Sequence, residues 1–162
     1  MKKFLKKFLS NKNNTVEDIK NLCEKLNIIK YTIIDGKVNV EGDVDLSSLE
    51  LTKIPLVFGI VTGNFDISNN KLESLIGSPN TVGGNFNCSK NNLTRLLGSP
   101  GEIYNCFDCS ENNLKSLRGG PSKVDGDYKS IYNFIQSLDD LNCTIRGNKY
   151  FGSNLNQSIQ TT

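Results

Sequence analysis

The sequence predicts an α/β solenoid, a stack of similar coils with one parallel strand per coil and helical caps at both ends. A unit of about 21 residues repeats in constant register, and a period near 20 residues is typical of solenoids. Within each unit, apolar and polar residues alternate over a short segment, which indicates a half-buried strand. Apolar residues at helical spacing stand out before and after the repeats, and they place helices at the ends.

Equivalent residues of successive units form columns. The apolar column that opens each unit contains Val61, Val82, Ile103 and Val124. The aromatic column contains Phe65, Phe86 and Phe107, and the column two residues later contains Ile67, Cys88 and Cys109. Two leucine columns contain Leu72, Leu93, Leu114 and Leu75, Leu96, Leu117. Phe65 and Ile67 alternate with polar residues, so each unit should form one short strand. Its Gly-x-Pro end should leave the other side of the coil extended or irregular.

An asparagine column lies between the strand and the first leucine column, at Asn70, Asn91 and Asn112. The columns on either side are apolar, so the amide side chains should also point inward. A buried amide has to be hydrogen-bonded. We therefore expect these residues to bond backbone groups where the coil bends and to form a ladder through the stack.

The residues from Gly84 to Pro100, and less perfectly those from Asn105 to Pro121, read G-N-F-x-C-S-x-N-x-L-x-x-L-x-G-x-P. This pattern resembles the short leucine-rich repeats of bacterial and tailed-bacteriophage proteins, and it is similar to the Pro-containing repeats of secreted bacterial effectors. The resemblance covers about residues 31–128. It implies a binding scaffold, and it brings no catalytic residues.

Three parts of the chain follow from these patterns. Residues 1–39 should form a basic segment, a helix and a hairpin, and residues 40–128 the repeats, with about four coils plus a partial fifth. Residues 129–162 should form a C-terminal helical cap and tail. Thr15 and Asp18 have the spacing of a capping box, which predicts a helix over residues 16–27. Asp35-Gly36 predicts the turn of a hairpin over residues 31–40.

The segment after the repeats has apolar residues at the spacing of an amphipathic helix: Ile131, Phe134, Ile135, Leu138 and Leu141. We expect this helix to cover the last coil. Residues 143–151 should add a strand or irregular cover, and residues 157–162 a tail.

Composition argues against catalysis and metal binding. The chain has no histidine and five cysteines. Cys88 and Cys109 stand in an apolar column, where a thiol acts as a small hydrophobe. Cys106 and Cys109 form one C-x-x-C, but no second pair exists to complete a zinc site. The sequence therefore predicts no catalytic residue, no metal and no cofactor.

The cysteines also bear on the compartment. Their odd number and core-type placement favour a reducing cytoplasm, which would be the host cytoplasm for a phage-encoded chain. No apolar run approaches the length of a membrane span. Residues 1–10 alternate lysine pairs with Phe-Leu pairs, so an amphipathic contact with a membrane surface is a weaker alternative.

The concave face of the predicted sheet is the candidate binding surface. Its columns contain Asp43, Asp45, Asn64, Asp66, Asn85, Asn87, Cys106, Asp108 and Asp127, followed by a serine column. These columns hold no lysine or arginine, so the face should favour a basic protein and repel nucleic acid. Its area is roughly 300 Å², below the about 800 Å² per partner of a standard interface, so an end, a loop edge or a second copy would have to contribute.

These observations favour a non-enzymatic protein-binding module, which in a phage would dock on a host protein. The alternative is a structural protein that assembles with copies of itself through an incompletely capped end. Homo-oligomers are therefore compatible with the sequence, whereas a membrane partner is disfavoured.

Overall fold

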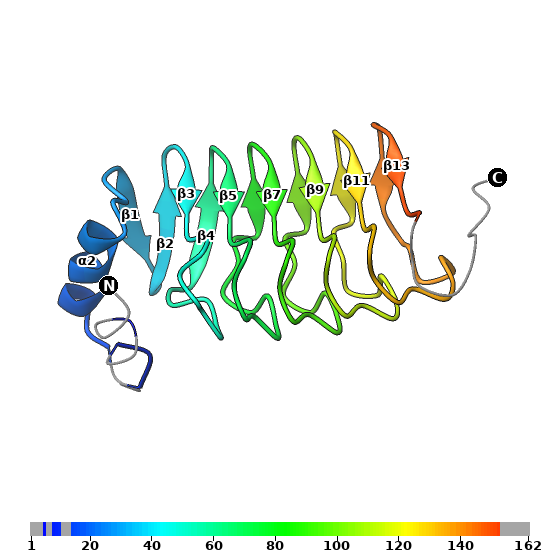
Figure 1. Cartoon of the computed structure of the whole chain (residues 1–162). Coiled ribbons are helices and arrows are strands. Elements are labelled where there is room, and N and C mark those ends of the chain that lie inside the picture. Colours follow the sequence, from blue (N-terminus) through cyan, green and yellow to red (C-terminus); the bar gives the residue numbers. More distant parts are fainter. Residues whose placement is uncertain (1–4, 6–7, 11–13, 153–162) are drawn as a thin grey trace.

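The computed structural model describes residues 5, 8–10 and 14–152, and it is a β-solenoid with a helix at its N-terminal end (Figure 1). Helix α2 (Val16–Lys25) begins where the capping box predicts, because the Thr15 hydroxyl accepts a hydrogen bond from the Asp18 amide and the Asp18 side chain accepts one from the Thr15 amide. The helix ends at Lys25 rather than at residue 27. Leu22 and Cys23 are its fully buried residues.

Two sheets of short strands run along the solenoid. Sheet A has seven strands in the order β1 (Tyr31–Ile34), β2 (Lys37–Val40), β4 (Phe58–Val61), β6 (Thr81–Val82), β8 (Glu102–Ile103), β10 (Lys123–Val124) and β12 (Thr144–Ile145). Sheet B has six, in the order β13 (Lys149–Tyr150), β11 (Tyr128–Lys129), β9 (Phe107–Asp108), β7 (Phe86–Asn87), β5 (Phe65–Asp66) and β3 (Val44–Asp45). The hairpin β1–β2 is antiparallel, as its Asp35-Gly36 turn predicts, and the other pairs are parallel.

The expectation of one strand per coil is wrong, because each repeat contributes a strand to both sheets. In the repeat that opens with Thr81, β6 leads through a tight turn at residues 83–85 into β7. Val82 is buried and Thr81 is half-exposed, so β6 itself has an inner and an outer face. The opening apolar column therefore belongs to a separate strand that packs against the aromatic column from the opposite side of the core.

Stacked aromatic rings fill the core between the sheets. The ring centroids of Phe65 and Phe86 are 5.6 Å apart, and those of Phe86 and Phe107 are 5.8 Å apart. Tyr128 and Phe151 extend this row to the C-terminal end, at 4.8 Å from Phe107 to Tyr128 and 5.5 Å from Tyr128 to Phe151. Full burial of each ring contributes roughly 1.5–3 kcal/mol to the free energy of unfolding, so the row is a large part of the core.

Residues 131–141 contain no helix, so the predicted C-terminal helical cap is wrong. They form another coil, in which Asn133 takes the asparagine position and Ile135 and Leu138 take the two leucine positions. The repeat itself places two leucines three residues apart, which imitates helical spacing. Tyr132, with φ 56°, has the left-handed backbone that Lys90 and Glu111 have at the same position, and this conformation interrupts a helix.

The asparagine column forms a continuous hydrogen-bonded ladder. The Asn91 Oδ1 atom accepts a bond from the Leu72 amide of the preceding coil at 2.9 Å. Its Nδ2 atom donates to the carbonyl oxygens of Ile67 at 3.0 Å and Cys88 at 3.1 Å, which belong to the preceding coil and to its own. Asn70, Asn112 and Asn133 repeat this arrangement. Each amide thus joins two coils.

The coil that contains Tyr128 differs from its neighbours at two positions that meet in space. Tyr128 replaces the phenylalanine of the aromatic column, and Gly120 replaces the serine found at Ser78 and Ser99. A Cβ atom at Gly120 would lie 3.1 Å from the Tyr128 hydroxyl oxygen, which is tighter than an ordinary contact. The absence of a side chain at Gly120 therefore makes space for the hydroxyl group. Burial raises the pKa of Tyr128 well above its usual value, so this phenol stays neutral.

We expect Asn91→Ala to lower the free energy of unfolding by about 2–4 kcal/mol, because it leaves buried backbone groups of two coils without partners. The matched control is Asn92→Ala, since the neighbouring Asn92 side chain is exposed. Urea denaturation followed by circular dichroism measures both. Similar losses for the two variants would contradict the structural role of the ladder.

We expect Gly120→Ser to destabilise the protein by about 1–3 kcal/mol, because its side chain crowds the Tyr128 hydroxyl. In the Tyr128→Phe background the same change should cost at least about 1 kcal/mol less, since the double variant restores the Ser and Phe combination of the other coils. Gly101→Ser is the control, because a Cβ atom there meets its nearest neighbour at 3.7 Å. A cost of Gly120→Ser that does not change between the two backgrounds would refute this packing relation.

Candidate functional site

The outer face of sheet B carries a row of carboxylates and one amide, which we call the acidic row: Asp45, Asp66, Asn87 and Asp108. Each Oδ1 atom accepts a hydrogen bond from the amide of the serine two residues later. The distances are 2.9 Å at Asp45, 2.8 Å at Asp66, 3.1 Å at Asn87 and 2.9 Å at Asp108. These local turns fix the side-chain orientation without any help from a partner.

Neighbouring members of the acidic row lie one coil apart, at the roughly 4.8 Å spacing of adjacent strands. Two unit charges at that distance repel by roughly 1 kcal/mol in water. Asn87 separates Asp66 from Asp108, and its Nδ2 atom donates to Asp66 Oδ2 at 3.2 Å. The amide therefore relieves repulsion in the middle of the row, and the repulsion between Asp45 and Asp66 remains.

A shallow depression of about 420 Å³ follows this row. Its polar lining comes from Asn64, Asp66, Asn85, Asn87, Cys106, Asp108 and Lys129. Lys129 occupies the position of the acidic row in the next coil, so the charge changes sign there. The sequence prediction ended the repeats at residue 128 and missed this lysine, although it stands in register with Asp108.

The remaining predicted site residues lie at the tight turn between the two sheets, and their side chains hold the coils together. The amide of Asn64 donates to Asp43 Oδ1 at 2.6 Å, and the amide of Asn85 donates to Asn64 Oδ1 at 2.8 Å. The amide of Cys106 continues the series to Asn85 Oδ1 at 3.1 Å. Asp127 and Asn148 extend it to the last coil, and Asn148 was missed for the same reason as Lys129.

Close approach of the coils at this turn favours glycine, which stands at four of the five equivalent positions from residue 63 onward, at residues 63, 84, 126 and 147, with Asn105 as the exception. A Cβ atom at Gly84 would lie 2.5 Å from Asn64 Oδ1 and 2.9 Å from the Gly63 carbonyl carbon. These turn residues, which we call the turn column (Asp43, Asn64, Asn85, Cys106, Asp127 and Asn148), therefore take part in the stacking of the coils. The acidic row beside it is exposed at Asp45 and half-buried at Asp66, Asn87 and Asp108, whereas Asn64 and Asn85 of the turn are exposed, so both columns contribute to the surface.

The outer face of sheet A carries a second polar cluster, which the sequence did not reveal because no strand was expected there. The Tyr104 hydroxyl donates to Glu102 Oε2 at 3.0 Å, and Lys123 Nζ lies 4.4 Å from the centroid of the Tyr104 ring. Asp125 pairs with Lys123 at 3.1 Å and with Arg146 at 3.2 Å. The hydrogen bond to Glu102 raises the pKa of Tyr104. These side chains mostly neutralise one another.

The same face becomes apolar toward the N-terminal hairpin. A groove of about 630 Å³, which we call the hairpin groove, runs over β1, β2 and β4. Three of its lining residues are exposed isoleucines: Ile29 at 79%, Ile34 at 59% and Ile60 at 49%. Lys30 and Glu41, which form an ion pair at 3.7 Å, lie at its margin.

Chemically reactive groups are sparse among the described residues. Residues 5, 8–10 and 14–152 include no group of three or more His, Cys, Asp or Glu side chains that could hold a metal ion. Burial raises the pKa of the Cys88 and Cys109 thiols well above the usual range, and it raises the pKa of Cys23 to about 11. Over the same part of the chain, no helix has the length and apolar character needed to cross a membrane.

The structure places the predicted site residues in two adjoining columns rather than in one patch. Comparison of the chain with protein-family models, with curated proteins and with solved structures found no match. The assignment of a function therefore depends on the geometry of these surfaces.

We expect Cys106 to be the first thiol to react when the native protein is treated with iodoacetamide at pH 8. Cys23, Cys88 and Cys109 are buried, and only about one in a thousand Cys143 thiols is ionised at this pH because its pKa is raised to about 11. Peptide mass spectrometry after timed labelling measures the rates, and Cys106→Ser should remove the fast phase. Labelling of Cys88 or Cys109 as fast as Cys106 would show that this column does not lie in the core.

Proposed function

We propose that the protein is a non-enzymatic protein-binding module whose acidic row receives a basic segment of its partner. The observation that carries this proposal is the local turn at Asp45, Asp66 and Asp108, in which one carboxylate oxygen is held by a backbone amide. A side chain that is already ordered loses little conformational entropy on binding. The row is thus suited to recognition.

A cationic partner improves the electrostatics of this face. Lysine or arginine side chains above Asp45 and Asp66 would replace carboxylate repulsion by attraction. Lys129 at the C-terminal end of the depression would repel the same cations, so the partner should lie over β3 to β9. An extended segment fits best, because the row is straight and one side chain wide.

The resemblance to leucine-rich repeats of phage and bacterial proteins supports a binding role and stays a prediction. In the phage case the partner would be a host protein, and the site of action the host cytoplasm. Membrane association through residues 1–10 also stays a prediction, since that segment lies largely outside the described residues.

The test is affinity capture from a lysate of the source organism, with wild type and an Asp45→Asn/Asp66→Asn/Asp108→Asn variant. Asn87 shows that asparagine keeps the turn, because its Oδ1 atom accepts the Ser89 amide. The triple variant therefore removes three charges and keeps the local fold. The control is Glu17→Gln/Glu24→Gln/Glu73→Gln, which changes the net charge equally at exposed positions elsewhere.

We expect a basic protein to be retained by wild type and by the control and to be lost with the triple variant. Binding should also weaken as the salt concentration rises, because the charges are near the surface. Equal recovery of the same proteins by all three chains would exclude the acidic row as the binding site.

A further inference from the structure

Strand β1 is the free edge of sheet A. It lies at the end of the strand order, beside α2 at the N-terminal end of the solenoid, and no described strand lies beyond it (Figure 1). It has four residues, whereas the other end strands, β3, β12 and β13, have two each. It contains neither proline nor a charged residue, which are the common means of blocking an edge.

The hairpin geometry shows which backbone groups of β1 point away from β2, toward the side where the described residues provide no further strand. In an antiparallel pair, every second residue bonds its partner strand and the residues between them face away. The Glu41 amide donates to the Lys30 carbonyl oxygen at 2.9 Å, so Lys30, Thr32 and Ile34 are the residues that bond toward β2. Tyr31 and Ile33 therefore direct their N–H and C=O groups to the open edge.

The two faces of β1 have different surroundings. Tyr31 lies on the inner face, since its half-buried side chain packs against the core and stands opposite buried Val40 of β2. Thr32 and Ile34 lie on the outer face and line the hairpin groove with Ile60. The helix lies beside β1 at the N-terminal end, and Thr32 and Ile34 on the outer face are exposed (Figure 1).

We propose that this edge pairs with the β1 edge of a second copy of the chain, antiparallel about a two-fold axis at Thr32. Left-handed Asp35, with φ 50°, ends the strand, so registers shifted toward the turn lose a bonded pair. With Thr32 opposite Thr32 of the second copy, Tyr31 faces Ile33 and Ile33 faces Tyr31. This register forms two bonded residue pairs, with four backbone hydrogen bonds in all.

The side chains favour a second copy as the occupant. The register places an aromatic residue opposite a β-branched one twice, and a threonine opposite a threonine, which are stabilising cross-strand pairs. On the outer face the aliphatic stem of Lys30 would cover exposed Ile34 of the other copy. No residues of like charge are opposed. The strand is therefore complementary to itself.

The first test is sedimentation velocity over a concentration range from about 5 μM to about 1 mM, which spans the affinities of small interfaces. We expect a reversible monomer–dimer equilibrium. Thr32→Lys should weaken dimerisation about tenfold, because it opposes two like charges on the axis. Thr81→Lys, on the same outer face but in the central strand β6, should leave the equilibrium unchanged. Circular dichroism establishes that both variants are folded.

The second test uses cross-linking to check the register. Directly opposed residues of a non-bonded pair have Cα atoms about 4.5 Å apart, which is within disulfide range. In a Cys106→Ser background, Thr32→Cys should therefore form a disulfide-linked dimer under mild oxidation, and Thr81→Cys should not. A monomer at every concentration would overturn the proposal. So would a dimer that is insensitive to Thr32→Lys and that cross-links equally well at both positions.

Discussion

The stacking of each coil in register on the one before it is the constraint on which the rest of the structure depends. Two columns of side chains impose it, at opposite ends of the sheet B strands. Asn91 bonds the preceding coil through both an acceptor and a donor atom. In the turn column, the bond that joins each pair of coils needs only an acceptor atom on the side chain. For example, the Cys106 amide donates to Asn85 Oδ1. This difference explains the sequences. The first column is asparagine wherever a preceding coil exists, whereas the second accepts Asp, Asn and even Cys.

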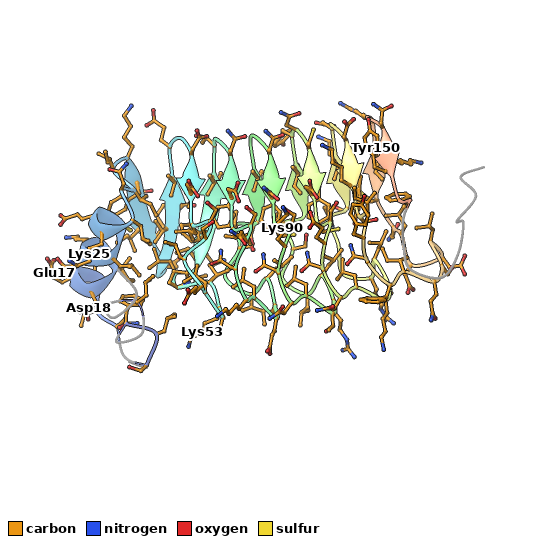
Figure 2. All side chains as sticks on the ribbon, in the orientation of Figure 1. Glu17, Asp18, Lys25, Lys53, Lys90 and Tyr150 are labelled. Carbon is orange, nitrogen blue, oxygen red and sulfur yellow. The ribbon has the colours of Figure 1, made fainter. Side chains whose placement is uncertain are left out.

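The same constraint separates positions that stacking fixes from positions that it leaves free. Inward residues such as Phe86 must fit the row of rings above and below them, and Gly84 must leave space for the neighbouring backbone. Outward residues of both sheets have no such requirement. At one outward position of sheet B the residues are Asp, Asp, Asn, Asp, Lys and Tyr from β3 to β13. Tyr150, the last of these, lies at the opposite end of the solenoid from Glu17, Asp18 and Lys25 of α2 (Figure 2). The proposed binding would therefore depend on these outward positions.

Sequence patterns predicted the features that recur in every coil. They failed where one pattern is compatible with two kinds of secondary structure. The period gave the solenoid and the inward asparagines, because identical environments select identical residues. The strand around Val82 was missed, since two residues are too few to show alternation. The helix expected over residues 131–141 failed because Ile135 and Leu138 match both helical and repeat spacing, and Asn133 was the residue that distinguished them. For the candidate site, the sequence predicted the negative charge of the surface. It did not predict that Asn64 and Asn85 bond the neighbouring coil, because a polar residue at a turn and a polar residue on the outer face of a strand follow the same sequence pattern.

The two proposed surfaces are related by the geometry of the edge. The proposed two-fold axis passes through Thr32 perpendicular to sheet A. It reverses the direction of the second solenoid but leaves the inner face of its sheet A on the same side, so sheet B of both copies would lie on one side of the joined sheet. The acidic rows of the two copies would then face a partner from one side, on solenoids that extend in opposite directions. The whole predicted face of one copy, of which the acidic row is a part, offers only roughly 300 Å², below the about 800 Å² of a standard interface. Two linked rows would raise the effective concentration of the second contact without any new chemistry. Pairing through β1 would therefore double the area on offer to roughly 600 Å², and the linkage of the two contacts would compensate for the rest.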